Sequence, residues 1–124
     1  MNFTARDFLL IEGKDDFVEL RIIAEHVGDL LRTDDPQRIR TATLAVLREV
    51  MEEALVEVGT LNPTTGELDT WTCGHQEAID RISREWQALA RSLKLYEIAC
   101  FRDTIRGKEI AAQLPGRVAA PPGS

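Results

Sequence analysis

The chain has 124 residues, 44% of them hydrophobic, and a formal net charge of −6. This length suits one domain, and the apolar content is enough to bury a core rather than leave the chain disordered. The acidic balance argues against a general polyanion-binding protein, because phosphate contacts come mainly from surplus Lys and Arg. No apolar run approaches 18 residues, so we expect no membrane contact. Two cysteines without C-x-x-C spacing indicate a reduced, cytoplasmic protein without a disulfide scaffold.

Two helices are predicted in the first third of the chain. For the first, Thr4 is the expected cap with Asp7 as its capping-box partner, and Gly13 offers a left-handed stop. The second is expected over residues 16–32, where apolar residues recur at helical spacing. One of the two aspartates at its start is the expected cap.

A third helix and a hairpin follow. Asp34 and Asp35 can cap a helix that Pro36 begins, because the N–H that proline lacks would be unpaired at the first helical position. We expect this helix to reach about residue 54. From there the residues become alternating and β-branched, which predicts a β-hairpin over 55–72 with Gly66 accepting a positive φ in its turn.

The last third returns to helical spacing. Residues 74–93 predict a long amphipathic helix. The short apolar segment 95–101 fits either a third strand or a helical turn. Thr104 is the expected cap of a last short helix, and residues 115–124, rich in proline and glycine, are expected to form a mobile tail.

This order predicts a mostly helical, single α+β domain over residues 1–114, with a small antiparallel hairpin sheet. Two helices joined by a tight turn and followed by a hairpin resemble a winged-helix domain. The segment from Phe101 to Glu109, with its T-x-x-G pattern at Thr104, is similar to the strand-to-helix exit of that superfamily. The resemblance implies a winged-helix-like fold with one extra long helix, and a dimeric DNA-binding regulator as one function.

Basic residues of the third helix are the candidates for that DNA-binding interpretation. Arg38, Arg40 and Arg48 lie on the helix that would touch bases, although a solvated helix face explains them as well. The predicted hairpin argues against DNA, because residues 55–72 contain three acidic side chains and no Lys or Arg.

The same hairpin is the candidate site for a protein partner, with Glu57, Glu67, Asp69 and Trp71 as its residues. Residues 1–35 hold four basic and nine acidic side chains, whereas residues 81–117 hold eight basic and four acidic ones. This asymmetry fits docking to another protein or to a second copy, and it equally fits charge pairing within one chain. Trp71 fits either an exposed anchor or core packing.

Metal binding and catalysis have little support in the sequence. Cys73, His75, Cys100 and His26 lack the paired short spacing of structural zinc sites, so we expect no metal and no cofactor. No nucleophile–base motif or glycine-rich phosphate loop is present, and we expect no catalytic residues. The sequence therefore favours a small, acidic, non-catalytic protein-interaction module such as an adaptor, immunity-like or regulatory protein.

Overall fold

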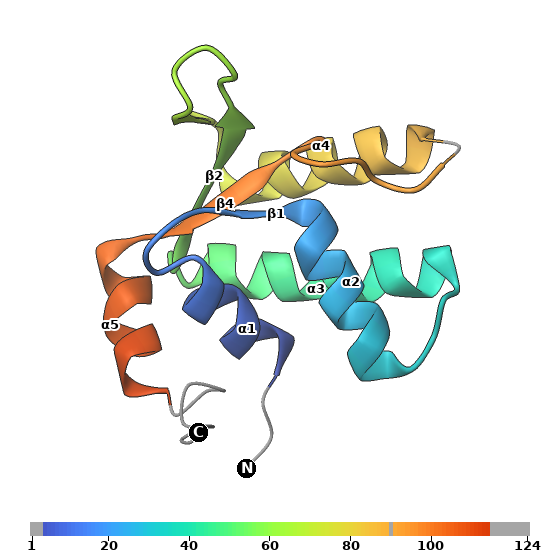
Figure 1. Ribbon diagram of the computed structural model, residues 1–124, viewed down its shortest axis with the longest axis horizontal. Helices are drawn as coiled ribbons and strands as arrows, with labels where there is room; N and C mark the ends of the chain where they lie inside the picture. The colour runs from blue at the N-terminus through green and yellow to red at the C-terminus, as the bar shows by residue number, and fades with distance from the viewer. Residues whose placement is uncertain (1–3, 90, 115–124) are drawn as a thin grey trace.

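The computed structural model describes residues 4–89 and 91–114 of the chain. Figure 1 shows β1 and β4 crossing the middle of the molecule, with α1, α2, α3 and α5 on one side and α4 running beside α3. The elements are α1 (Ala5–Glu12), β1 (Val18–Glu19), α2 (Leu20–Leu31), α3 (Pro36–Glu52), β2 (Val56–Leu61), β3 (Leu68–Thr70), α4 (His75–Ala88), β4 (Cys100–Asp103) and α5 (Ile105–Gln113).

The strands form one antiparallel sheet in the order β1-β4-β2-β3. The predicted hairpin is its β2–β3 half, and β4 pairs with the free side of β2. Phe101 of β4 lies opposite Val18 on one side and Val58 on the other. The chain is therefore an α+β protein, as the sequence predicts.

The core lies where the helices meet the sheet. It is formed by the apolar faces of the helices together with residues of β4. Trp86 of α4 is buried in this core. The side chains with the largest fully buried volumes are Phe101, Leu9, Leu10, Leu20, Ile23, Leu47, Leu55, Ile79 and Ile82.

The cap of the first helix is confirmed, and its stop is corrected. Thr4 and Asp7 form the predicted capping box, in which the Thr4 side chain accepts from the backbone N–H of Asp7. Gly13 ends the helix at φ −84°, so the expected left-handed conformation is wrong. A Cβ atom at Gly13 would lie 2.7 Å from Oδ1 of Asp103. This glycine is needed for a close approach rather than for its dihedral freedom.

The second helix begins later than its hydrophobic pattern predicts. Val18 and Glu19 pair with β4, so α2 starts only at Leu20. Its N-cap is Glu19, without a side-chain hydrogen bond, rather than one of the preceding aspartates. Asp16 instead accepts from the backbone N–H of Phe17. Here pairing with β4, a strand about 80 residues later in the sequence, overrides the local helical pattern.

The third helix and the hairpin turn follow the sequence closely. Asp35 caps α3 by accepting from the N–H of Gln37, and Pro36 is the first helical residue. Gly66 has the expected positive φ of 74°. These elements rest on local capping and turn chemistry, which explains why they are readable without tertiary context.

The chain after α4 departs from the prediction. The helix ends at Ala88 rather than near residue 93, with Leu89 already extended. Tyr96 and Ile98 then adopt positive φ values of 58° and 69°. A left-handed conformation is costly for a β-branched residue such as Ile98. Only from Cys100 does the segment become strand, so the predicted strand lies later than expected.

The last helix is capped as predicted, because the Thr104 hydroxyl accepts from the N–H of Gly107. Gly107 packs directly on the backbone carbonyl of Leu55, and no side chain could occupy this position without moving it. Ile105, the first residue of α5, is 79% exposed. The predicted tail, 115–124, lies outside the described residues.

Asp103 is a buried acid at the β4–α5 joint. Its side chain is 3% exposed, and neither carboxyl oxygen has a hydrogen-bond partner among the residues described. Burial raises the pKa of Asp103 to about 7, against the opposing attraction of Lys108 and Lys14. The folded state therefore favours the protonated carboxyl, whereas the unfolded chain ionises it near its ordinary value.

This burial predicts a pH-dependent loss of stability. As pH rises from about 4 to about 8, the wild-type protein should lose about 2–4 kcal/mol relative to Asp103→Asn, because only the wild type must keep a proton on a buried carboxyl. Urea denaturation at several pH values measures the difference. Asp34→Asn, at an exposed position, is the control. A difference between Asp103→Asn and wild type that stays constant with pH would contradict the expectation.

Candidate functional site

The β2–β3 hairpin stands out from the body of the molecule (Figure 1). Its turn is held by Asn62, whose side-chain oxygen accepts from the N–H groups of Thr64 and Thr65. The strand order leaves the outer edge of β3 without a partner strand among the described residues. The hairpin therefore presents an ordered turn and an open sheet edge.

The three acids of the hairpin are not equivalent. Glu57 lies opposite Arg102 in the β2–β4 register and forms an ion pair with it at 3.0 Å. Asp69 accepts from the side-chain amide of Asn62 at 3.2 Å. Glu67 is exposed, and within the described part of the chain neither Glu67 nor Asp69 forms an ion pair. The uncompensated negative charge thus belongs to Glu67 and Asp69.

Trp71 follows β3 and is half-buried. Its indole N–H donates to the hydroxyl of Thr60 at 2.9 Å. The guanidinium carbon of Arg81 lies 3.9 Å from the centre of a Trp71 ring, a cation–π contact. Since Arg81 belongs to α4, the geometry gives Trp71 an intramolecular role in bracing the hairpin against that helix.

The structure does not bring the three α3 arginines together. Arg38 is exposed and lines a shallow groove with Thr41 and Ala45. Arg40 lines a different groove, between α2, α3 and the segment after α4. Arg48 donates to the side chain of Gln76 on α4 at 2.7 Å. The sequence singled out Arg40 but gave no sign of the residues that surround it from other elements.

The thiols and imidazoles do not form a reactive constellation in the part of the chain that is described. Burial raises the pKa of the Cys100 thiol to about 11, which keeps it protonated and unreactive. Cys73 is half-buried, and His75 is exposed at the start of α4. No group of three or more His, Cys, Asp or Glu that could hold a metal ion occurs within residues 4–89 and 91–114.

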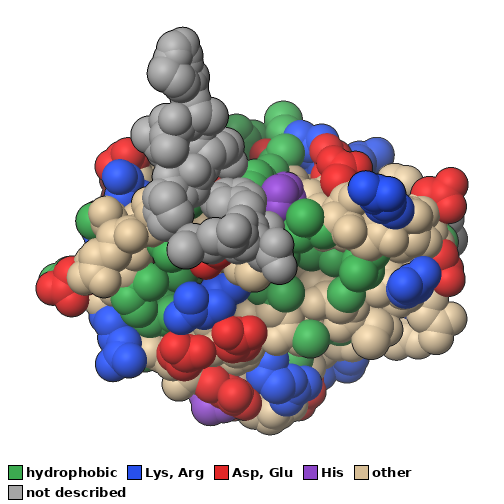
Figure 2. Space-filling view, turned by 90° about the horizontal axis from the view of Figure 1, so that it is seen from below, with side chains coloured by type: hydrophobic (Ala, Val, Ile, Leu, Met, Phe, Trp, Pro, Cys, Tyr) green, Lys and Arg blue, Asp and Glu red, His purple; other side chains and the backbone are tan. Residues whose placement is uncertain are grey.

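On the face seen in Figure 2, acidic and basic side chains are interspersed with apolar ones, and no large area carries charge of a single sign. None of the described helices is both long and apolar enough to cross a bilayer. No protein-family model, curated protein or solved structure matches the chain.

The contacts of Trp71 predict a structural effect of its removal. Trp71→Ala should lower the free energy of unfolding by about 2 kcal/mol, because it removes packing, a hydrogen bond and a cation–π contact together. Trp71→Phe should retain most of this stability. Urea denaturation measures both, with the exposed Leu95→Ala as control. An unchanged unfolding midpoint for Trp71→Ala would contradict the bracing role of this side chain.

Proposed function

We propose that this protein is a non-catalytic interaction module that docks a basic segment of another protein along its β2–β3 hairpin. The observation that carries the proposal is the open edge of β3 on a projecting hairpin whose uncompensated charges are Glu67 and Asp69. Reduced thiols at Cys73 and Cys100 support a cytoplasmic setting for it.

An open strand edge offers a specific mode of binding. Its unpaired N–H and C=O groups accept an extended segment as an added strand, with backbone hydrogen bonds supplying affinity. Carboxylates beside the edge discourage pairing with a similar acidic edge and attract a basic segment. The hairpin therefore favours a basic, extended partner.

The hairpin is also held in place before binding. Trp71 connects it to α4, and Glu57 connects β2 to β4 through Arg102. A surface that is already ordered loses less conformational entropy when it binds. This bracing supports a recognition role for a hairpin that would otherwise be marginally stable.

A charge reversal tests the docking surface. Glu67→Lys with Asp69→Lys should abolish binding of the partner, because the reversed charges repel a basic segment. The matched control is Glu52→Lys with Glu109→Lys, which changes net charge equally at exposed positions away from the hairpin. Pull-downs from native lysate with the three proteins, read by quantitative mass spectrometry, identify partners by their pattern of retention.

The expected partner is retained by wild type and control, lost by the hairpin variant, and released as salt is raised. If every retained protein behaves alike with the two variants, the hairpin is not the docking surface. Sedimentation equilibrium of the same variants covers the case of a second copy as partner. In that case the dimer mass of wild type should fall to the monomer mass in the hairpin variant.

A DNA-binding regulator is the second candidate function, in line with the winged-helix resemblance. Arg38, Thr41, Ala45 and Arg48 recur at spacings of three and four, which places them on one face of α3. The first three are exposed. Arg38, near the N-terminal end of this face, supports the DNA-binding interpretation, since a recognition helix contacts bases through its N-terminal residues. Arg48 is partly buried and donates to Gln76.

The DNA-binding alternative makes a distinct prediction. Wild-type protein should bind mixed duplex DNA at low salt and lose affinity steeply as salt rises, since phosphate contacts release counterions. Arg38→Gln should weaken this binding several-fold, measured by fluorescence anisotropy. Absence of binding at any salt concentration would remove this alternative and leave the protein-interaction proposal standing.

A further inference from the structure

A groove of about 510 Å³ lies between α2, α3, α4 and the segment that follows α4. Its walls are largely apolar and come from all three helices. The apolar lining residues are Ala24, Pro36, Ile39, Trp86, Leu89 and Leu93. This volume and lining are typical of sites for small molecules, which combine apolar walls with a few placed polar groups.

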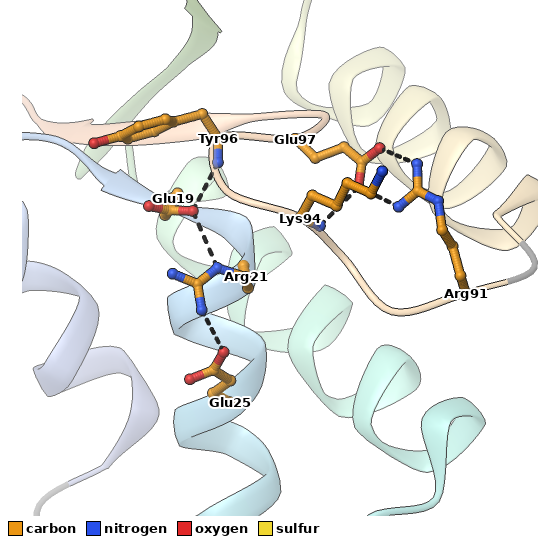
Figure 3. Close-up of polar contacts among 7 residues, drawn as sticks. All are labelled: Glu19, Arg21, Glu25, Arg91, Lys94, Tyr96 and Glu97. Carbon is orange, nitrogen blue, oxygen red and sulfur yellow. Dashed lines mark hydrogen bonds and ion pairs between the residues drawn. The ribbon is translucent and has the colours of Figure 1, made fainter.

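Three arginines also line the groove, and two of them are already neutralised. Arg21 pairs with Glu25 at 2.7 Å and with Glu19 at 3.4 Å. Arg91 holds Glu97 through two hydrogen bonds of 2.9 and 2.6 Å. Figure 3 shows the first network along the start of α2 and the second on the segment after α4, joined by the hydrogen bond from Tyr96 to Glu19.

Arg40 is the third arginine, and it differs from the other two. It lines the groove from α3, and among the described residues it forms no ion pair or hydrogen bond with a side chain. A guanidinium presents a planar fork of donors that matches a carboxylate. Because Arg40 lies beside apolar walls, the groove suits a ligand that has one anionic end and an apolar body.

We propose that this groove binds a small amphipathic monocarboxylate, with Arg40 holding the carboxylate and the side chains of Trp86 and Leu89 packing against the apolar body. Asp34 also lines the groove and, among the described residues, forms no ion pair, whereas Glu25 is paired with Arg21. A second carboxylate on the ligand would therefore meet the negative charge of Asp34. The groove therefore selects a ligand with one carboxylate over one with two.

The wall formed by the segment after α4 is held in a fixed shape. The backbone N–H of Tyr96 donates to the buried carboxylate of Glu19 at 2.7 Å, which fastens this segment to α2. Hydrogen bonds from Arg91 and from the N–H of Lys94 hold the pKa of Glu97 at about 2, so this clamp stays ionised at ordinary pH. The positive φ of Ile98 is a strained conformation that these contacts maintain.

The experiment uses defined probes. Trp71→Phe leaves Trp86 as the single tryptophan of the chain, because the sequence contains two. Its fluorescence then reports on the groove, and isothermal titration calorimetry gives the affinity. The probes are octanoate and 4-phenylbutyrate, each compared with its neutral amide, and suberate, the dicarboxylate that matches octanoate in length.

At least one of the two acids should change the Trp86 emission and bind about tenfold or more tightly than its amide, since the charged hydrogen bonds to Arg40 are lost with the amide. Arg40→Gln should remove this preference, whereas Arg38→Gln, on the outer face of α3, should retain it. Suberate should bind more weakly than octanoate.

Three results would overturn the proposal. The first is equal affinity for an acid and its amide. The second is that Arg38→Gln weakens binding as much as Arg40→Gln, and the third is that no probe binds. Suberate as tight as octanoate would overturn the selection of one carboxylate. Circular dichroism of the Arg40→Gln variant separates a lost ligand contact from a lost fold.

Discussion

The pairing of β4 between β1 and β2 is the constraint on which the fold depends. Through Phe101, which is fully buried, this strand joins residue 18 to residue 58 in adjacent ladders. It also brings the end of α1 against Asp103, so closely that a Cβ atom at residue 13 would displace the Asp103 carboxyl group. Since its contacts are distant in sequence, the sheet forms only when both halves of the chain are present, and loop closure must precede its stabilisation.

The charge asymmetry of the sequence is partly resolved within the fold. Glu57 meets Arg102 across the sheet, and Arg6 of α1 meets Glu49 and Glu53 at the end of α3. These pairs are partly exposed and contribute little to stability. Among the described residues, Glu67 and Asp69 of the hairpin and Arg40 in the groove take no part in these ion pairs. Net charge alone could not have located either.

Elements determined by neighbours in sequence can be predicted from the sequence, whereas elements determined by distant contacts cannot. The capping box at Thr4, the proline start of α3 and the turn at Gly66 depend on neighbours in sequence, and each is confirmed. The late start of α2 is not readable, because Glu19 joins a strand that follows 80 residues later. Trp71 could be placed near the hairpin but not on Arg81, since a cation–π contact leaves no sequence pattern.

The candidate sites divide in the same way. The acids of the hairpin lie within one contiguous segment, residues 55–72, so the sequence could gather them, whereas the groove is assembled from α2, α3, α4 and the segment after α4. Arg40 lies close to Arg38 in sequence, although side chains two residues apart on a helix point to nearly opposite sides. A residue's function here depends on which helix it faces, and only the tertiary packing supplies that.

Helix α4 connects the two surfaces. Arg81 on this helix contacts Trp71 below the hairpin, and Trp86, five residues further on, lines the groove. Binding at one surface can alter the other only if it favours one placement of α4 over another. Any such coupling must be reciprocal, so that a carboxylate that strengthens partner binding is itself bound more tightly in the presence of the partner. The α3–α4 packing, with Arg48 donating to Gln76, is the contact that would have to change.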